Sequence, residues 1–316
     1  MTRFVVRRFL QALIVLVFAS VFTFLIFQVI PNGNPALRLA GRTATPMQIA
    51  AITRAWGFNK PVYVQYFDTM EKIFTGTVVS YSQQVNVLSQ IRQGLPATAS
   101  LAIGASILWL LWGIAFGLLS ARRPRGIVDR VLAAFSLTAI SMPVFVVGSV
   151  LLYVLAFRTS LFPNGGYVPF SQSASQWFLH MVLPWFTLSL PAAGFYSRVF
   201  RSNLLETVHQ EYVRTARAKG LSRRRVVLGH VVRNSLIPVL SLWGLDFAGV
   251  IGGGAILTET VFNLHGIGQY AASSIQLLDV PPIMVIVMYA AVAVVIIGAV
   301  VDVLYALLDP RILLNA

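Results

Sequence analysis

The chain lacks cysteine and carries little charge. None of its 316 residues is Cys, and only 11% are Asp, Glu, Lys or Arg. The absence of cysteine excludes disulfides, thiolate metal sites and cysteine nucleophiles. Soluble domains contain about 25% charged residues, and a soluble chain that is 57% apolar would expose too much apolar surface. The composition therefore predicts an all-α integral membrane protein.

The sequence also lacks the motifs of common enzyme classes. Its histidines are scattered without metal-ligand spacing, and no lysine follows a glycine as a phosphate-binding P-loop requires. There is no G-x-S-x-G nucleophile elbow. An integral-membrane enzyme is therefore disfavoured, and an ATP-driven process would need its nucleotide site in another chain.

Six uncharged or nearly uncharged runs are long enough to cross a membrane, which takes about 20 apolar residues. The first run exceeds the apolar core of a signal peptide, and no small-x-small cleavage site follows it, so a retained span is favoured over a signal peptide. The sequence predicts six transmembrane helices. They lie at or within residues 9–30, 93–121, 131–157, 177–197, 236–258 and 283–301.

The basic residues are distributed unevenly between the loops. With the N-terminus inside, the inside segments are 1–8, 122–130, 198–235 and 309–316, and they hold 17 of the 24 Lys and Arg. Cytoplasmic loops carry such an excess of basic residues. The sequence therefore predicts an N-in, C-in topology with 198–235 as a cytoplasmic loop.

The large outside segment, residues 31–92, is expected to be a small helical cap. Thr45 followed by Pro46 is typical of a helix start, and Gly57 of its end. A second helix is predicted from residue 61 to 75, ending at Gly76. The chain then divides into residues 1–30 with the first span, the extracytoplasmic cap 31–92, and a core membrane domain 93–316.

The stretch EYVRTARAKGLSRRRVV, residues 211–227, concentrates positive charge in the cytoplasmic loop. Residues 204–219 have helical character, and Gly220 is a natural stop. Val213, Ala216 and Gly220 form a stripe of small side chains that predicts close approach of another backbone or groove. A lipid-surface helix would carry bulky apolar residues, and a single-strand nucleic-acid site would interleave aromatic ones. A protein-docking helix is favoured, while the cations at 223–225 are ascribed to topology alone.

These residues also carry a family resemblance. EYVRTARAKGLS followed by HVVRNSLIPV resembles the cytoplasmic loop of first-type ABC-importer permeases of the dipeptide/oligopeptide branch. PNGNP, WGFNKPVYVQY, LPATASLA, SMPVF, ETVFNLHGIG and LLDPRI resemble further family motifs across nearly the whole chain. The chain departs from the family at His265, where proline is usual, at a late Ile-Pro element, and at GTVVSYS, residues 76–82, which leaves the substrate class open.

The resemblance implies a type I ABC-importer transmembrane domain whose partners supply the energy. It implies a homologous second permease, two ATP-binding subunits or one two-domain ATPase, and an extracytoplasmic substrate-binding protein. ATP and magnesium would bind to the ATPase, so no cofactor is expected on this chain. The implied coupling helix consists of Glu211, Tyr212, Val213, Arg214, Thr215, Ala216, Arg217, Ala218, Lys219 and Gly220.

The resemblance further implies a prokaryotic inner-membrane location, contact with membrane lipid, and no nucleic-acid partner. Import of dipeptides or oligopeptides is the expected function, although similar permeases carry nickel complexes and other small solutes. The alternative is an autonomous channel or ion-coupled carrier. That alternative would need a self-contained charged pathway, for which one carboxylate inside a span gives little support.

Polar and helix-breaking residues in the predicted spans are candidates for the translocation pathway. Asp246, within the fifth span, either faces a polar pathway or makes a packed hydrogen bond or helix-break cap. Pro143 is expected to kink the third span, with Ser141 satisfying the freed carbonyl, and an architectural kink is favoured over substrate contact. Glu259 and His265 are candidates for an outer gate or binding-protein contact, with a plain loop as the alternative.

Overall fold

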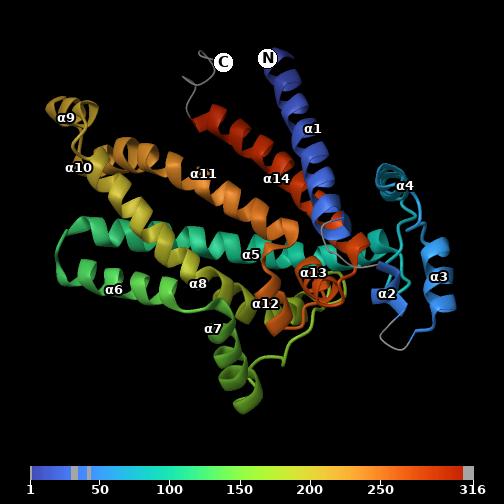
Figure 1. The fold of residues 1–316 in the computed structure, drawn as a ribbon. Helices are drawn as coiled ribbons and strands as arrows, with labels where there is room; N and C mark the ends of the chain where they lie inside the picture. The colour runs from blue at the N-terminus through green and yellow to red at the C-terminus, as the bar shows by residue number, and fades with distance from the viewer. Residues whose placement is uncertain (1, 30–34, 41–43, 309–316) are drawn as a thin grey trace.

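The computed structural model describes residues 2–29, 35–40 and 44–308, and it is built from helices (Figure 1). Within these residues the only β pairing is an isolated antiparallel bridge between Val79 and Asn86, which confirms the all-α prediction for this part of the chain. Residues 31–34 of the PNGNP motif and the predicted inside segment 309–316 lie outside the described residues.

The α-helices are α1 (Thr2–Phe24), α2 (Pro35–Ala40), α3 (Pro46–Ala55), α4 (Val62–Thr75), α5 (Val87–Arg122), α6 (Ile127–Ser141), α7 (Val144–Leu151), α8 (Ala174–Thr207), α9 (Glu211–Ala218), α10 (Arg223–Val226), α11 (Arg233–Gly249), α12 (Ile256–Val261), α13 (Ile267–Gln276) and α14 (Val280–Leu308). The π-helical segments are η1 (Leu25–Val29), η2 (Leu152–Arg158), η3 (Val227–Val232) and η4 (Val250–Gly254).

Four helical stretches within the described residues are long and apolar enough to cross a membrane. A fifth candidate is a bent pair whose first half is α6 and whose second half is α7 continued by η2. Helix α1 with η1 contributes a shorter apolar stretch. The four long stretches are Val87–Arg122, Ala174–Thr207, Arg223–Gly254 and Val280–Val301.

The predicted third span is broken rather than continuous. The two halves, Ile127–Ser141 and Val144–Arg158, meet at an angle of 97°. Pro143 lies at the break, where it precedes the first residue of α7. Proline lacks a backbone N–H and drives the residue before it into an extended conformation, as Met142 shows with ψ of 126°. The expected kink at Pro143 is therefore confirmed, and it divides the predicted third span, 131–157, into two helical halves.

The core of the molecule is the close packing of α5 on α8 (Figure 1). Small residues on α5 allow the two backbones to approach, as in many membrane helix pairs. A Cβ at Gly117 would lie 2.8 Å from the carbonyl oxygen of Ser197. Trp109, Tyr196 and Phe200 fill the space between these helices and are fully buried.

The cap helices begin and end as the sequence predicts. The Thr45 side chain accepts a hydrogen bond from the backbone N–H of Gln48, and the side-chain oxygen of Gln48 accepts one from the backbone N–H of Thr45. Pro46 is the first residue of α3. Helix α4 ends at Gly76, which has a left-handed φ of 76°. Helix α5 already begins at Val87, so the last residues of the segment 31–92 belong to the long helix.

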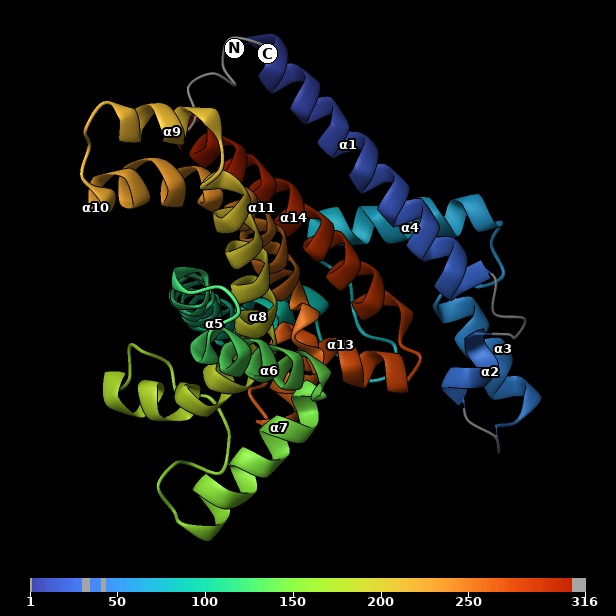
Figure 2. The same cartoon turned by 90° about the vertical axis from the view of Figure 1, so that its left-hand side faces the viewer.

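The elements at the two ends of the molecule come from different parts of the chain. Helices α9 and α10 protrude at one end, whereas the cap helices α3 and α4 lie at the other (Figures 1 and 2). Helix α14 runs beside α1 between these ends. We call these the coupling end (residues 208–235) and the cap end (the cap with the corner of α12 and α13).

Candidate functional site

Helix α9 is a short, separate helix between α8 and α10. The helical character predicted for 204–219 is divided, because α8 ends at Thr207 and α9 starts at Glu211. Lys219 caps α9, and Gly220 follows with a left-handed φ of 78°. A Cβ at Gly220 would meet no atom within 4 Å, so the backbone conformation alone requires glycine here. The predicted stop at Gly220 is confirmed.

The inner face of α9 belongs to the hydrophobic core of the membrane helices. Val213 is completely buried and Ala216 is 6% exposed, and both join the same core cluster as Leu204 of α8 and Val226 of α10. The sequence prediction that these small residues receive a partner's backbone is therefore wrong. Their size instead lets α9 lie close against its own chain.

The outer face of α9 is free for a partner. Tyr212 is the one aromatic residue of this face, and its hydroxyl accepts a hydrogen bond of 2.9 Å from Nδ2 of Asn234 on α11. Within residues 44–308, no ion pair engages the three cations of this face. The exposed residues of α9 and its cap are Glu211, Tyr212, Arg214, Thr215, Arg217, Ala218, Lys219 and Gly220.

Asp246 lies on α11 and is held by the neighbouring helix. The hydroxyl of Tyr196 on α8 donates a hydrogen bond of 2.7 Å to Oδ2 of Asp246. The Asp246 side chain is nevertheless exposed on the surface of the single chain, as are Ser141 and Pro143. The structure thus shows the packed hydrogen bond and leaves the carboxylate accessible. In the described part of the chain the Ser141 side chain makes no hydrogen bond, so the expectation that it satisfies the carbonyl freed by Pro143 is wrong.

The glycines after Asp246 produce a break in the helix. Segment η4 contains Gly253 with a φ of 95°, which L side chains rarely adopt. A Cβ at Gly252 would lie 3.0 Å from the Cβ of Ala290 on α14. Local unwinding and close helix packing therefore occur together in this segment.

Glu259 is fully buried and organises the corner between α12 and α13. Its Oε1 accepts a hydrogen bond of 2.7 Å from Oγ1 of Thr98 on α5, and its Oε2 accepts one of 2.8 Å from the backbone N–H of Gln269. Burial raises the pKa of Glu259, and hydrogen bonds from Thr98 and from the backbone of Gln269 and Gly268 act in the opposite direction. The carboxylate thus caps the N-terminus of α13. It presents no surface to a binding protein, unlike His265, which is exposed in a left-handed turn.

A second buried carboxylate, Asp279, fastens the cap to the membrane helices. Its oxygens accept hydrogen bonds from the hydroxyls of Ser80 and Ser82, both 2.5 Å, and from the backbone N–H of Tyr81 and Ser82. Burial and the charge of Asp279 raise the pKa of Tyr81. These three partners lie in GTVVSYS, the stretch that departs from the family motif. The sequence singled out that stretch but offered no signal for Asp279.

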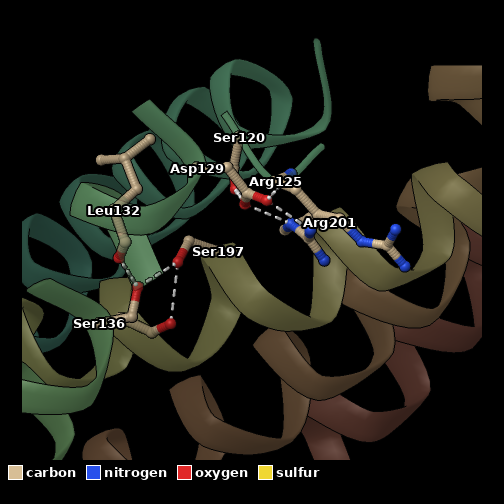
Figure 3. A network of polar contacts seen from close by, with 8 residues as sticks. Ser120, Arg125, Asp129, Leu132, Ser136, Ser197 and Arg201 are labelled. Carbon is tan, nitrogen blue, oxygen red and sulfur yellow. Dashed lines mark hydrogen bonds and ion pairs between the residues drawn. The ribbon is translucent and has the colours of Figure 1, made fainter. Parts of the chain in front are cut away.

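Asp129, at the start of α6, is a third buried carboxylate that sequence reasoning missed (Figure 3). Arg201 on α8 pairs with both of its oxygens, from Nε to Oδ1 and from Nη2 to Oδ2, each at 2.7 Å. The hydroxyl of Ser120 and the backbone N–H of Arg125 also donate to it. Among the described residues, no group of His, Asp or Glu side chains is arranged to hold a metal ion.

Comparison with known proteins places these features in one family. A family model described as binding-protein-dependent transport system inner membrane component matches residues 113–314, and the model of its N-terminal part matches residues 1–102. The chain is 38% identical to the probable peptide ABC transporter permease protein y4tP of Sinorhizobium fredii, over 98% of both chains. It is 36% identical to the dipeptide transport system permease protein DppB of Lactococcus lactis, over 99% of both. It is 32% identical to the oligopeptide transport system permease protein AppB of Bacillus subtilis, again over 99% of both.

Proposed function

Because the chain belongs to the family of binding-protein-dependent transport system inner membrane components, we propose that it forms half of the translocation pathway of an importer of dipeptides or oligopeptides. It is a permease subunit of an ABC transporter in the inner membrane, and it is not itself an enzyme. The peptide cargo follows from the relatives' names, and the bacterial organisms of these relatives agree with a prokaryotic membrane.

The proposed topology has six spans with both termini in the cytoplasm. Helix α1 with η1 is the first span, and the bent pair of α6 and α7 with η2 is the third. The four long helical stretches supply the others. The distribution of Lys and Arg supports this orientation, which puts the coupling end in the cytoplasm and the cap end outside.

The proposed partners complete a transporter that this chain cannot form alone. A homologous second permease contributes the other half of the pathway, and a binding protein delivers the substrate to the cap end. ATP and magnesium bind to two ATPase subunits or to one two-domain ATPase. An autonomous channel or ion-coupled carrier is the weaker alternative, because family membership supports the importer.

The observation that carries the coupling proposal is the two-sided character of α9. Its exposed face presents Arg214, Arg217 and Lys219 to a partner, while Val213 and Ala216 lie in the core shared with α8 and α10. A force applied to the outer face therefore acts directly on the packing of the membrane helices. We assign ATPase contact to the exposed residues of 211–220, while Val213 and Ala216 position the helix from inside and Gly220 ends it.

The proposed pathway includes Asp246, with Ser141 and Pro143 at the bend of the third span. All three lie on the exposed surface of the single chain, where a second permease would face them across a pathway. At the outer side we propose that exposed His265 contacts the binding protein. Glu259 contributes to the outer gate by holding the corner of α12 and α13 from inside.

The test is ATP-driven uptake of labelled peptides by membrane vesicles that contain this chain with its second permease, ATPase and binding protein. The substitutions Arg214→Glu and Arg217→Glu reverse the charge on the outer face of α9. We expect the double variant to lose co-purification of the ATPase and to lower uptake at least about tenfold, because close charge pairs at interfaces contribute more than about 1.5 kcal/mol.

The matched control is Arg223→Glu with Arg224→Glu, which changes two exposed arginines on α10 by the same charge. Uptake should remain within about twofold of the unmodified transporter if those residues act only in topology. Peptide uptake that persists without any ATPase chain would refute the importer and favour a carrier. Equal losses in the two double variants would refute the assignment to α9.

A further inference from the structure

A polar pocket opens between α6 and α8, near the loop 123–126 that joins α5 to α6. It has a volume of about 540 Å³, and its lining includes Arg125, Arg130, Arg198 and Arg201 but only one carboxylate, Asp129. Figure 3 shows Asp129 and Arg201 from these two helices pointing toward each other beside the pocket. Four guanidinium groups against one carboxylate leave a clear surplus of positive charge.

Asp129 neutralises one of these arginines and leaves the others available. Its two oxygens are occupied by Arg201, Ser120 and a backbone N–H. Arg130 and Arg198 are exposed, and neither makes an ion pair or hydrogen bond through its side chain in the part of the chain that the structure describes. The side chain of Arg125 is likewise exposed and without an ion pair in the described residues, so the pocket contains one fixed cation, Arg201, and three unpaired ones.

One exposed hydroxyl adds a donor for the oxygen atoms of an anion. The buried hydroxyls of Ser136 and Ser197 bond to each other at 2.9 Å (Figure 3) and to helix carbonyls, so the available hydroxyl is that of Ser202, which is exposed at the pocket. Hydroxyl and guanidinium groups together are typical donors to phosphate oxygens.

The outer face of α6 beside the pocket is strongly apolar. Ile127 is 81% exposed, Val131 60% and Leu137 53% on the single chain. Charged donors and an apolar strip therefore adjoin each other at the start of a membrane helix. A ligand that satisfies both needs an anionic head and alkyl chains, which free phosphate lacks.

We propose that this pocket binds the headgroup phosphate of an anionic phospholipid, with Arg130 and Arg198 as the principal contacts. In the proposed orientation the pocket lies at the cytoplasmic leaflet, where anionic lipids give a negative surface and basic pockets between helices hold phosphate headgroups. The acyl chains lie along the apolar strip of α6. A protein partner would need carboxylates that match three arginines and would cover the apolar strip as well.

The experiment is a lipid titration of the full chain in mild detergent, followed by native mass spectrometry. Phosphatidylglycerol is the probe, and phosphatidylcholine and inorganic phosphate are the comparison ligands. We expect preferential retention of phosphatidylglycerol. The double variant Arg130→Gln with Arg198→Gln should weaken that binding at least about tenfold, since each basic residue at a membrane surface attracts anionic lipid substantially.

Two further double variants separate the site from general surface charge and from misfolding. Arg223→Gln with Arg224→Gln removes the same charge from α10 and should leave lipid retention within about twofold. Arg130→Lys with Arg198→Lys keeps the charge and should retain most of the binding. Equal loss in the α10 variant, or a Lys variant as weak as the Gln variant, would overturn the proposal.

The same titration tests whether free phosphate, a neutral lipid or the second permease occupies the pocket instead of an anionic lipid. Displacement of the lipid by inorganic phosphate at equal concentration, or equal retention of phosphatidylcholine, would refute an anionic-lipid site. The titration is repeated on the complex with the second permease. Loss of phosphatidylglycerol there would show that the pocket is a subunit interface, and retention would support the lipid site. Lipid retention does not depend on the cargo or on contact with the ATPase. The lipid site can therefore be refuted while the proposed transport function stands, and the reverse also holds.

Discussion

The contacts that stabilise the coupling end differ in kind from the contacts that stabilise the cap end. At the cap end, the buried carboxylates Glu259 and Asp279 accept hydrogen bonds from the distant residues Thr98, Ser80 and Tyr81, and Glu259 also accepts one from the nearer backbone of Gln269. At the coupling end, α9 is held by the apolar contacts of Val213 and Ala216 and by one side-chain hydrogen bond from Asn234 to Tyr212. The first set of contacts is directional, and the second is largely not.

The difference indicates which end is built to shift. Buried charge-assisted hydrogen bonds specify one geometry, because a displaced partner leaves a buried polar group unsatisfied. Apolar side chains can change neighbours while staying buried. A helix that transmits movement from an ATPase benefits from the second kind of contact, whereas an outer corner that must keep its shape benefits from the first.

The largest effect on stability is expected for Glu259→Gln. The amide oxygen can still accept from Thr98, but the amide N–H group then faces the backbone N–H of Gln269. An unsatisfied buried donor costs about 1–3 kcal/mol. The apparent melting temperature of the full chain in detergent should fall. Glu206→Gln, an exposed position on α8, is the control and should leave it unchanged. Equal melting temperatures for the two variants would contradict the comparison.

Asp279→Asn is expected to loosen the cap with a similar or smaller cost. The carboxylate accepts from two hydroxyls and two backbone N–H groups, and an amide cannot satisfy all of them. Limited proteolysis should cleave the segment 76–86 faster in the variant. Asp68→Asn is the matched control, since the Lys60–Asp68 ion pair is exposed and such pairs contribute about 0–1 kcal/mol. A cap that resists protease equally in both variants would show that Asp279 is dispensable.

Gly220→Ala is expected to have an intermediate effect, confined to the coupling end. A Cβ at a φ of 78° costs about 1 kcal/mol, although it meets no neighbour. Substrate-stimulated ATP hydrolysis by the assembled transporter should fall several-fold, while membrane insertion is retained.

The control is Gly229→Ala on η3, where a Cβ also meets nothing within 4 Å but no left-handed φ is present. This variant should hydrolyse ATP normally, because alanine is at least as favourable as glycine within a helix. Wild-type stimulation in Gly220→Ala would refute the need for this helix stop.

Local features of the fold could be predicted because they depend on neighbouring residues. The helix start at Thr45 and Pro46, the stops at Gly76 and Gly220, and the kink at Pro143 all follow from the local preferences of a few residues. The angle of that kink could not be predicted, because packing against other helices sets it. The same holds for the division of residues 204–219 into two helices.

The anchoring carboxylates could not be predicted, because their partners lie far away in the sequence. Thr98 is 161 positions from Glu259, and Ser80 is 199 positions from Asp279. The stripe on α9 was misread for a related reason. Its spacing correctly identified one face of a helix, but periodicity cannot tell whether that face packs on its own chain or on a partner.

The smallest effect on stability is expected for Asp246→Asn. This variant tests whether the exposed carboxylate on α11, which lies in neither the cap end nor the coupling end, takes part in the translocation pathway. The amide oxygen can still accept the hydrogen bond from Tyr196, so assembly and the melting temperature should change little. Loss of the charge should nevertheless lower uptake of peptides several-fold if their amino group passes this carboxylate. Tyr196→Phe separates the two roles, since it removes the hydrogen bond and keeps the charge. Peptide uptake should then fall more in Asp246→Asn than in Tyr196→Phe, and the opposite order would assign Asp246 to helix packing alone.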